Sequence, residues 1–368
     1  MKTRMILVLV AVMLMAGQAF ANVVTKELPA SPGQKLVVDL ETGGSVTVRA
    51  GSANKVTVEG RLTGRDASDI DLRVEAASYG VKIESEFRTS RRNRSGGVDL
   101  TITVPSRFDV GITTLGGRIT LDGIEGSLEG STMGGQLDLR NLKGTVAMST
   151  MGGNVTLVSS RVDGEVSTMG GRVELRDIEG NVRGKSMGGS VIYDNVRPAP
   201  GTDARPVGIS TMGGDIEVPH APAGATVSTM GGNIEVRSAA KFVSAKTMGG
   251  DIRIREVDGW VEATTMGGDI EVRVTGSGRD RHIDLDSKGG NITVEVPADF
   301  PMDVDIEVTP GRRGRDRAAI VSDFGIRIDD VTEARRTGSS VRGVGSVNGG
   351  GNRVKIRTID GTVTLRKK

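Results

Sequence analysis

The chain is built from short segments in which apolar and polar residues alternate, and these segments return at a fixed interval. The clearest of these segments ends at Val272. In it Ile270 and Val272 are apolar, while Asp269 and Glu271 are polar. Strict alternation with β-branched residues is typical of a strand that has one inward face. Because a fixed interval of this size marks a stacked repeat, the pattern predicts a β-solenoid.

A Thr-Met-Gly-Gly peptide, or a close variant of it, precedes most of these segments. Its methionine returns at one constant interval that is lengthened once, at Met133, Met151, Met169, Met187, Met212, Met230, Met248 and Met266. Apolar alternation also precedes each methionine, so each coil is expected to hold two strands. Met-Gly-Gly would form one corner and a turn with a glycine such as Gly144 or Gly259 the other. We expect these glycines to supply positive φ.

A coil of this length cannot enclose a core alone, so coils must stack about 4.8 Å apart. We therefore expect an all-β fold, a parallel β-solenoid (β-helix) with coils of about 18 residues. Right-handed coils are favoured because about 98% of parallel crossovers are right-handed. The left-handed hexapeptide solenoid also makes coils of this size, but the sequence shows no sub-period of six.

Four regions follow from the pattern. Residues 1–21 combine Lys2 and Arg4 with an apolar run and a small-residue cleavage site, which predicts a signal peptide. In residues 22–112 apolar and polar residues alternate without the repeat period, so this region is expected to form an irregular β region or cap. Residues 113–296 are expected to form the regular repeats, and residues 297–368 a C-terminal β cap. The longer interval places a loop at Arg197–Pro206. Export would leave the protein periplasmic, on the cell surface or secreted.

The composition limits which kinds of core, partner and site the chain can form. The 368 residues include 54 Gly, two His and no Cys, which suits a thin aliphatic core. Without the leader, 46 basic residues face 46 acidic ones, so no nucleic-acid partner is expected. The apolar run of the leader is too short to span a bilayer, and no transmembrane helix is expected after cleavage. No catalytic, cofactor or metal residues are identified. Trp260, the only tryptophan, is expected to shield a corner.

The methionine column allows three interpretations. The side chains could pack on one another along the corner, because Met is an adaptable gap filler. They could instead form an apolar interaction ridge that contacts a partner or a membrane. They could also bind a soft metal such as Cu(I), although no His or Cys would assist.

Other columns are expected to be structural. The inward Thr/Ser column, of which Thr150 and Thr265 are members, should form a hydroxyl ladder between coils and to the turn backbone. The polar residue after Gly-Gly, such as Asp269, should bond local backbone. Outward Glu and Arg residues should pair across strands. Two basic loops could bind an anionic ligand such as an acidic glycan or a lipid head group, through Arg88, Arg91, Arg92, Arg94, Arg312, Arg313, Arg315 and Arg317.

Two stretches carry a family resemblance, namely 262–272 and 356–365, which includes Ile359-Asp360-Gly361. They resemble the bacterial putative-adhesin family of β-strand-repeat proteins, a domain of unknown function, over roughly residues 100–368. The resemblance implies an exported solenoid with an adhesive role and no established catalytic residues. Family members generally carry a small or polar residue after the threonine, where this chain carries Met.

These observations favour an exported, non-enzymatic β-solenoid that acts as an adhesin-like or scaffold module of the envelope. Its partner would be an envelope glycan, a lipid head group or a surface protein, while the oligomeric state stays open. One alternative is a polysaccharide-active β-helix enzyme, which would need two carboxylates beside a groove. The other is a structural or stress-related periplasmic protein without a ligand.

Overall fold

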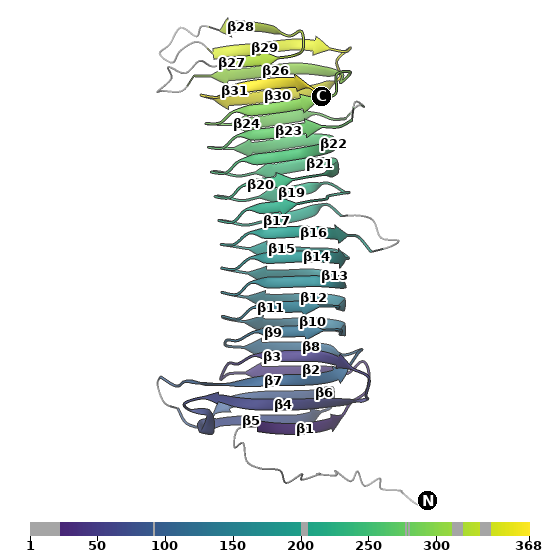
Figure 1. Ribbon diagram of the computed structural model, residues 1–368, viewed down its shortest axis with the longest axis vertical. Helices are drawn as coiled ribbons and strands as arrows, with labels where there is room; N and C mark the ends of the chain where they lie inside the picture. The colour runs from purple at the N-terminus through teal and green to yellow at the C-terminus, as the bar shows by residue number, and fades with distance from the viewer. Residues whose placement is uncertain are drawn as a thin grey trace, which may run out of the picture.

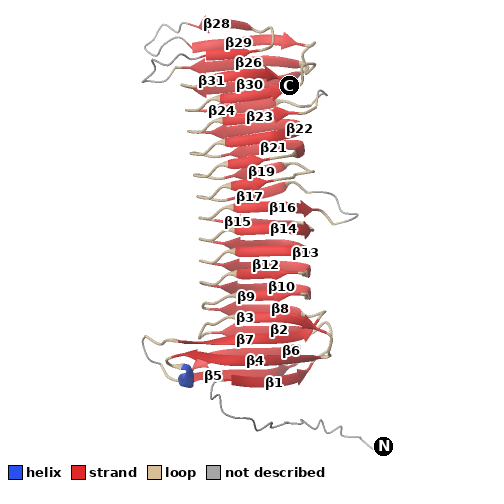
Figure 2. Ribbon diagram, in the orientation of Figure 1, coloured by secondary structure: helices blue, strands red, loops and turns tan. Residues whose placement is uncertain are grey.

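A computed structural model describes residues 23–90, 93–199, 205–276, 278, 280–310, 319–331 and 340–368. It forms one long column of stacked strands, with the N-terminal strands at one end and the C-terminal strands at the other (Figure 1). Within the described residues every regular element is a strand, apart from the short 3-10 helix η1 (Ala67–Asp69) near the N-terminal end (Figure 2). The predicted signal peptide, residues 1–21, lies outside the described residues.

The N-terminal part of the column contains nine strands. They are β1 (Val23–Pro29), β2 (Lys35–Leu40), β3 (Val46–Gly51), β4 (Lys55–Gly64), β5 (Ile70–Ala77), β6 (Gly80–Phe87), β7 (Gly96–Pro105), β8 (Asp109–Thr114) and β9 (Ile119–Asp122). β2 pairs in parallel with β6 on one side and β8 on the other, and β3 pairs likewise with β7 and β9. Antiparallel β1, β4 and β5 then close the end.

The middle of the column consists of parallel strands that follow one another in two series. They are β10 (Glu125–Thr132), β11 (Leu137–Arg140), β12 (Lys143–Thr150), β13 (Val155–Thr168), β14 (Val173–Glu179), β15 (Val182–Ser186), β16 (Val191–Arg197), β17 (Val207–Ser210), β18 (Ile216–Val218), β19 (Ala225–Ser228), β20 (Ile234–Val236), β21 (Ala239–Lys246), β22 (Ile252–Thr265), β23 (Ile270–Val274), β24 (Ile283–Ser287) and β25 (Ile292–Val296).

The parallel register follows the sequence period. Val155 lies opposite Val173, its equivalent in the next coil, and this offset recurs through most of the stack. Across the longer interval Val191 lies opposite Ile216, so the register is kept there as well. Equivalent residues of successive coils therefore form rows along the column. The all-β, mostly parallel architecture predicted from the alternation is confirmed.

The C-terminal end is closed by strands that do not follow chain order. They are β26 (Met302–Thr309), β27 (Ala319–Ser322), β28 (Arg327–Val331), β29 (Ser340–Val347), β30 (Asn352–Ile359) and β31 (Thr362–Lys367). β30 and β31 return to pair with β24 and β25, while β26 and β27 lie beyond them. Antiparallel β29 and β28 complete the end, so the open edge of the parallel stack is covered.

The core is a thin aliphatic interior between the two series of strands. Inward residues such as Ile119, Leu137, Val155 and Val173 are fully buried in contiguous rows. The hydroxyl ladder predicted from the Thr/Ser column is confirmed. Its side chains are buried and donate to the carbonyl of the second corner glycine one coil earlier, as Thr150 does to Gly135 at 2.8 Å.

The glycines of the two corners have different roles. At the corner opposite Met-Gly-Gly, Gly144 and Gly164 adopt positive φ as predicted, although Gly259 does not. The glycines of Met-Gly-Gly do not adopt positive φ either, so the prediction was wrong there. A Cβ on Gly153 would lie 1.9 Å from the Gly135 carbonyl oxygen of the preceding coil. Close approach of stacked backbones, not φ, requires the second glycine.

Candidate functional site

The most distinctive surface is the row of eight methionines at the Met-Gly-Gly corners. The backbone ladder continues through these corners, because Gly170 N–H donates to the Met151 carbonyl at 2.9 Å and Met212 N–H to the Met187 carbonyl at 2.9 Å. Consecutive methionines therefore lie about 4.8 Å apart, the spacing of paired strands. The longer interval does not break the row.

All eight methionine side chains face outward. Their exposed fractions lie between 47% and 51%, so about half of each side chain is open to solvent. Leu115, 55% exposed, occupies the same place one coil before Met133. We call these eight methionines the methionine row. Its nearly uniform exposure indicates that the side chains share one orientation.

A groove of about 620 Å³ lies beside the N-terminal part of the methionine row. Met133, Met151 and Met169 line it together with Ser131 and Ser149 of the adjacent strands. The serines belong to an outward column of mostly hydroxyl residues, namely Ser131, Ser149, Ser167, Lys185, Ser210, Ser228, Lys246 and Thr264. The surface next to the row thus carries mostly small, polar and uncharged side chains.

The residues after Gly-Gly flank the other side of the row. Their side chains were predicted to bond local backbone, but the Asp and Asn side chains among them bond the backbone of the next coil instead. Asp215 accepts from Asn233 N–H at 2.7 Å and Asp251 from Asp269 N–H at 2.9 Å. This ladder holds successive corners in register. It also places carboxylates along the C-terminal half of the methionine row.

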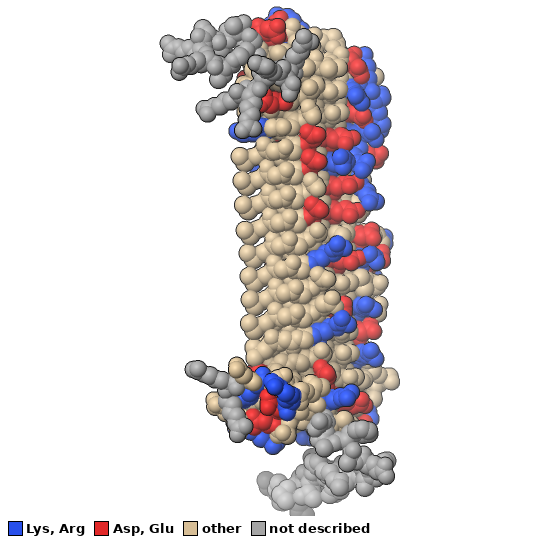
Figure 3. All heavy atoms as spheres, turned by 60° about the vertical axis from the view of Figure 1, so that its left-hand side comes forward, with Lys and Arg blue, Asp and Glu red and all other residues tan. Residues whose placement is uncertain are grey.

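The outward charged columns pair as predicted. Arg253 bonds Glu271 at 3.0 Å and Arg255 bonds Glu235 at 2.8 Å. The hydrogen bond from Arg255 holds the pKa of Glu235 below its ordinary value. Figure 3 shows Lys, Arg, Asp and Glu side chains gathered along one side of the column, while a broad strip free of charge runs between its two ends.

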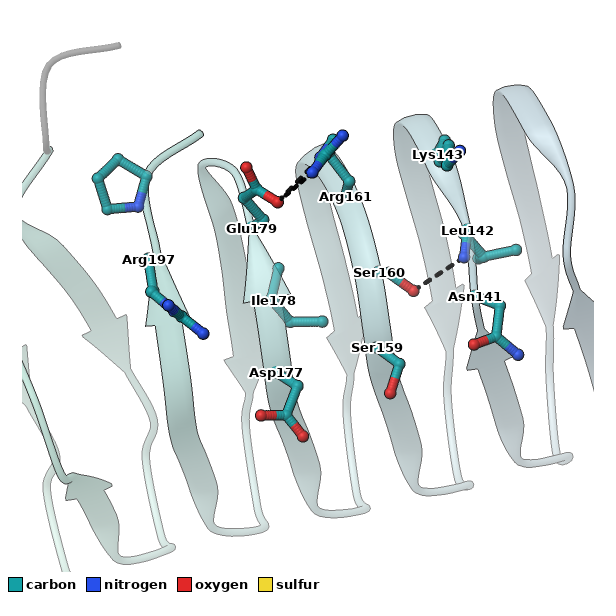
Figure 4. Close-up of a pocket in the computed structure, with 11 residues that line it drawn as sticks. Asn141, Leu142, Lys143, Ser159, Ser160, Arg161, Asp177, Ile178, Glu179 and Arg197 are labelled. Carbon is teal, nitrogen blue, oxygen red and sulfur yellow. Dashed lines mark hydrogen bonds and ion pairs between the residues drawn. The ribbon is translucent and has the colours of Figure 1, made fainter. Parts of the chain in front are cut away.

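A second hollow of about 800 Å³ lies at the opposite corner, beside the longer interval of the repeat. Lys143, Arg161, Glu179 and Arg197 form its charged column. In Figure 4 Arg161 and Glu179 point toward each other, and Arg161 donates twice to Glu179 Oε2, at 2.9 and 2.7 Å. Ser160 Oγ accepts from Leu142 N–H at 3.0 Å. The other oxygen, Glu179 Oε1, is buried without a hydrogen-bond partner in the described structure.

The predicted anionic-ligand loops are only partly described. Arg88 lies 3.6 Å from Asp71, and the guanidinium of Arg94 lies 4.5 Å from the centre of the Phe87 ring. The other members lie outside the described residues, namely Arg91, Arg92, Arg312, Arg313, Arg315 and Arg317. The two described arginines thus bind neighbouring side chains, and the ligand prediction stays a prediction.

One feature was missed from the sequence. Trp260 lies within β22, directly after Gly259 of the corner opposite Met-Gly-Gly, and its ring stacks between those of Phe242 at 4.7 Å and His282 at 5.4 Å. The signal available was that Phe242 and Trp260 are one repeat apart, which places them in one row. Gly224 makes room for the stack, since a Cβ there would lie 2.5 Å from the Phe242 ring. The stack is therefore a structural element.

Neither a cluster of hard metal ligands nor a membrane-spanning helix occurs among the described residues. No group of three or more His, Asp or Glu residues is arranged to hold a metal ion in the part of the chain that the structure describes. Across the same residues, no helix has the length and apolar character needed to cross a membrane. The methionine row offers soft sulfur atoms and no hard ligands, and it remains the main candidate site.

Comparison with known proteins identifies a family through one match. A profile described as Toastrack DUF4097 matches residues 33–366. No curated protein matches the chain significantly. Among solved structures, a putative cell adhesion protein from Clostridium sporogenes is 9% identical with a TM-score of 0.17, covering 94% of this chain and 100% of that one.

Two other solved structures are similar to the same extent. A putative adhesin from Bacteroides fragilis is 12% identical with a TM-score of 0.17, covering 95% of this chain and 98% of that one. A putative lipid binding protein from Parabacteroides distasonis is 10% identical with a TM-score of 0.24, covering 94% and 98%.

Proposed function

We propose that this chain, which belongs to the Toastrack DUF4097 family, is an exported adhesin-like module that binds a protein partner through its methionine row. The observation that carries the proposal is the uninterrupted row of eight half-exposed methionines. Long exposed apolar stripes on soluble proteins are usually interaction sites. Met is also enriched at protein interfaces, where its flexible side chain adapts to the partner.

The flanks of the row favour a protein partner over a lipid or a glycan. The groove beside it offers serine hydroxyls, which suit adaptable hydrogen bonding to a protein surface. Carboxylates of Asp215, Asp251 and Asp269 line the other flank and would repel anionic lipid head groups. The described residues that line this groove include no aromatic platform for a sugar ring.

The remaining parts of the proposal rest on the sequence and on the ion pairs. Residues 1–21 have the pattern of a cleaved signal peptide, which supports export to the periplasm, the surface or the medium. We infer right-handed coils of about 18 residues from the repeat and from the general handedness of parallel crossovers. A non-enzymatic role is supported by outward carboxylates such as Glu217 and Glu235, which are engaged by arginines.

The proposal is tested with a variant that makes the row polar. Met133, Met151, Met169 and Met187 are changed together to Ser, and binding of the purified chain to its own cell envelope is measured by sedimentation. We expect at least a tenfold loss of binding, because the apolar contact is removed at four of the five methionines that line the groove. Pretreating the envelope with protease should abolish binding of the original chain.

A matched control removes exposed apolar side chains away from the row. Tyr79 and Ile328 are 41% and 45% exposed, and changing both to Ser should leave binding unchanged. Undiminished binding of the four-serine variant, or full binding to protease-treated envelope or to lipid vesicles, would contradict the proposal. Circular dichroism and thermal unfolding of each variant show whether the column remains folded.

A further inference from the structure

We infer that the methionine row is a binding site for a soft monovalent metal ion of the Cu(I) class, held between thioethers of adjacent coils. The inference goes beyond the proposed adhesive function and does not depend on it. It rests on the choice of residue, on the spacing of the row and on the charges beside it. Nothing else in the described chain offers soft ligands in a repeated arrangement.

The choice of residue points to sulfur. The buried rows of the repeats are filled by Ile, Val and Leu, whereas the exposed corner position is Met in eight coils. An apolar contact alone could be made by leucine, and Leu115 does occupy that place in one coil. Outside the row, the methionines of the described chain are Met148 and Met302, and both are buried. Thioethers are soft ligands that select Cu(I) over hard cations.

The spacing fits a metal ion bridging two coils. Equal exposure indicates parallel side chains, so neighbouring sulfur atoms are separated by about the coil spacing of 4.8 Å. If the metal–sulfur bond is similar to that of zinc and thiolate, about 2.3 Å, two ligands on opposite sides of one ion lie about 4.6 Å apart. Small rotamer changes at a half-exposed side chain close the difference. Eight sulfur atoms used in pairs would hold about four ions.

The charges beside the row favour a cation at its C-terminal half. Asp215, Asp251 and Asp269 directly follow the Gly-Gly pairs there, whereas Arg172 holds this place in the N-terminal half. On the opposite flank Lys246 is paired with Glu262 at 3.3 Å, so its charge is compensated. The pairs formed by Met212, Met230, Met248 and Met266 should therefore fill first.

The test uses Cu(I) itself, titrated without oxygen into the purified chain against a coloured Cu(I) chelator. The C-terminal variant changes Met212, Met230, Met248 and Met266 to Leu, and the N-terminal variant changes the other four. We expect each variant to bind about half as many ions as the original chain, and the C-terminal variant to bind its remaining ions at least tenfold more weakly. Changing both Met148 and Met302 to Leu should alter neither quantity.

Two further measurements distinguish a thioether site from a histidine site and from non-specific binding. A thioether carries no proton to displace, so affinity should not change between about pH 5 and 8, where a histidine site would weaken. Full Cu(I) binding by a variant with all eight row residues changed to Leu, or a tenfold loss of affinity at the acidic end, would overturn the inference. Since leucine keeps the row apolar, envelope binding by that variant tests the adhesive proposal separately.

Discussion

At the scale of single residues, the buried hydroxyl of Tyr193 is satisfied within its own coil. It accepts from Gly184 N–H at 2.6 Å and donates to the Val182 carbonyl at 3.2 Å, both on the preceding strand β15. The site is tightly packed, because a Cβ on Gly184 would lie 2.9 Å from Val173. Burial raises the pKa of Tyr193 to about 12. The neutral phenol is thus part of the folded state.

This pKa predicts a loss of stability in alkali. Above about pH 10 the tyrosine ionises in the unfolded chain but stays protonated in the folded chain, so unfolding releases a proton. The contribution of protonated Tyr193 to the free energy of unfolding is complete below pH 10 and is lost as the pH rises toward 12. We expect a decrease of roughly 2–3 kcal/mol in the free energy of unfolding over this range, measured by urea unfolding.

The Tyr193→Phe variant isolates the effect. The free energy of unfolding of this variant should not show the alkaline decrease that Tyr193 causes. Near neutral pH the variant should be less stable by about 1–3 kcal/mol, because Gly184 N–H is left without an acceptor. Tyr79→Phe is the matched control, since that side chain is 41% exposed. If the stability curves of the Tyr193→Phe variant and the original chain remain parallel up to pH 12, the explanation is wrong.

At the scale of the element, each Met-Gly-Gly corner combines two opposite requirements. The second glycine lies in close contact with the coil before it and also donates its N–H to the corner threonine, as Gly153 does to Thr150 at 3.3 Å. The methionine two places earlier faces outward and is half exposed. The corner is therefore tight toward the stack and open toward solvent, which is what makes the row available to a ligand.

A pair of glycine substitutions tests the packing of the corner. Gly153→Ala should destabilise the column by at least about 4 kcal/mol, because the added Cβ meets backbone at 1.9 Å and the stacked coils must separate. Gly152→Ala should stay within about 0.5 kcal/mol, since its nearest neighbour would be 3.8 Å away. Urea unfolding compares the two, and equal effects would refute close approach as the cause.

At the scale of the whole molecule, the column behaves as a one-dimensional stack with covered ends. Each coil contacts the coil before it and the coil after it, while antiparallel strands close the N-terminal and C-terminal ends. In such stacks stability is approximately a sum of coil and interface contributions. The methionine row gains length with every coil, so the number of repeats sets the size of the candidate site.

Deletion of a complete coil tests this additivity. Removing residues 143–160 joins Leu142 to Arg161, which already occupies the place next to Lys143 in the stack. We expect a folded column whose Tm changes by only a few degrees. Removing residues 143–151 instead would omit half a coil and place the following strand out of register. That control should fail to fold cooperatively by circular dichroism; a cooperative Tm close to that of the original chain would contradict the model of a stack.

The sequence by itself determined the repeating part of this protein. The constant period, the inward rows such as Val155 and Val173, and the hydroxyl ladder that includes Thr150 could all be predicted from it. The physical reason is translational symmetry. When similar coils stack in register, neighbours in space lie at a constant offset in the sequence, so periodicity alone indicates the contacts.

Only the tertiary structure decided what that symmetry leaves open. Both ends break the period, and the return of β30 and β31 to a place between earlier strands depends on pairings between distant segments. The exposure of the methionines, the contact that requires Gly153, and the coil to which Asp215 bonds were equally undecided. These depend on side-chain direction and on backbone separation at the corners, which alternation of apolar and polar residues does not specify.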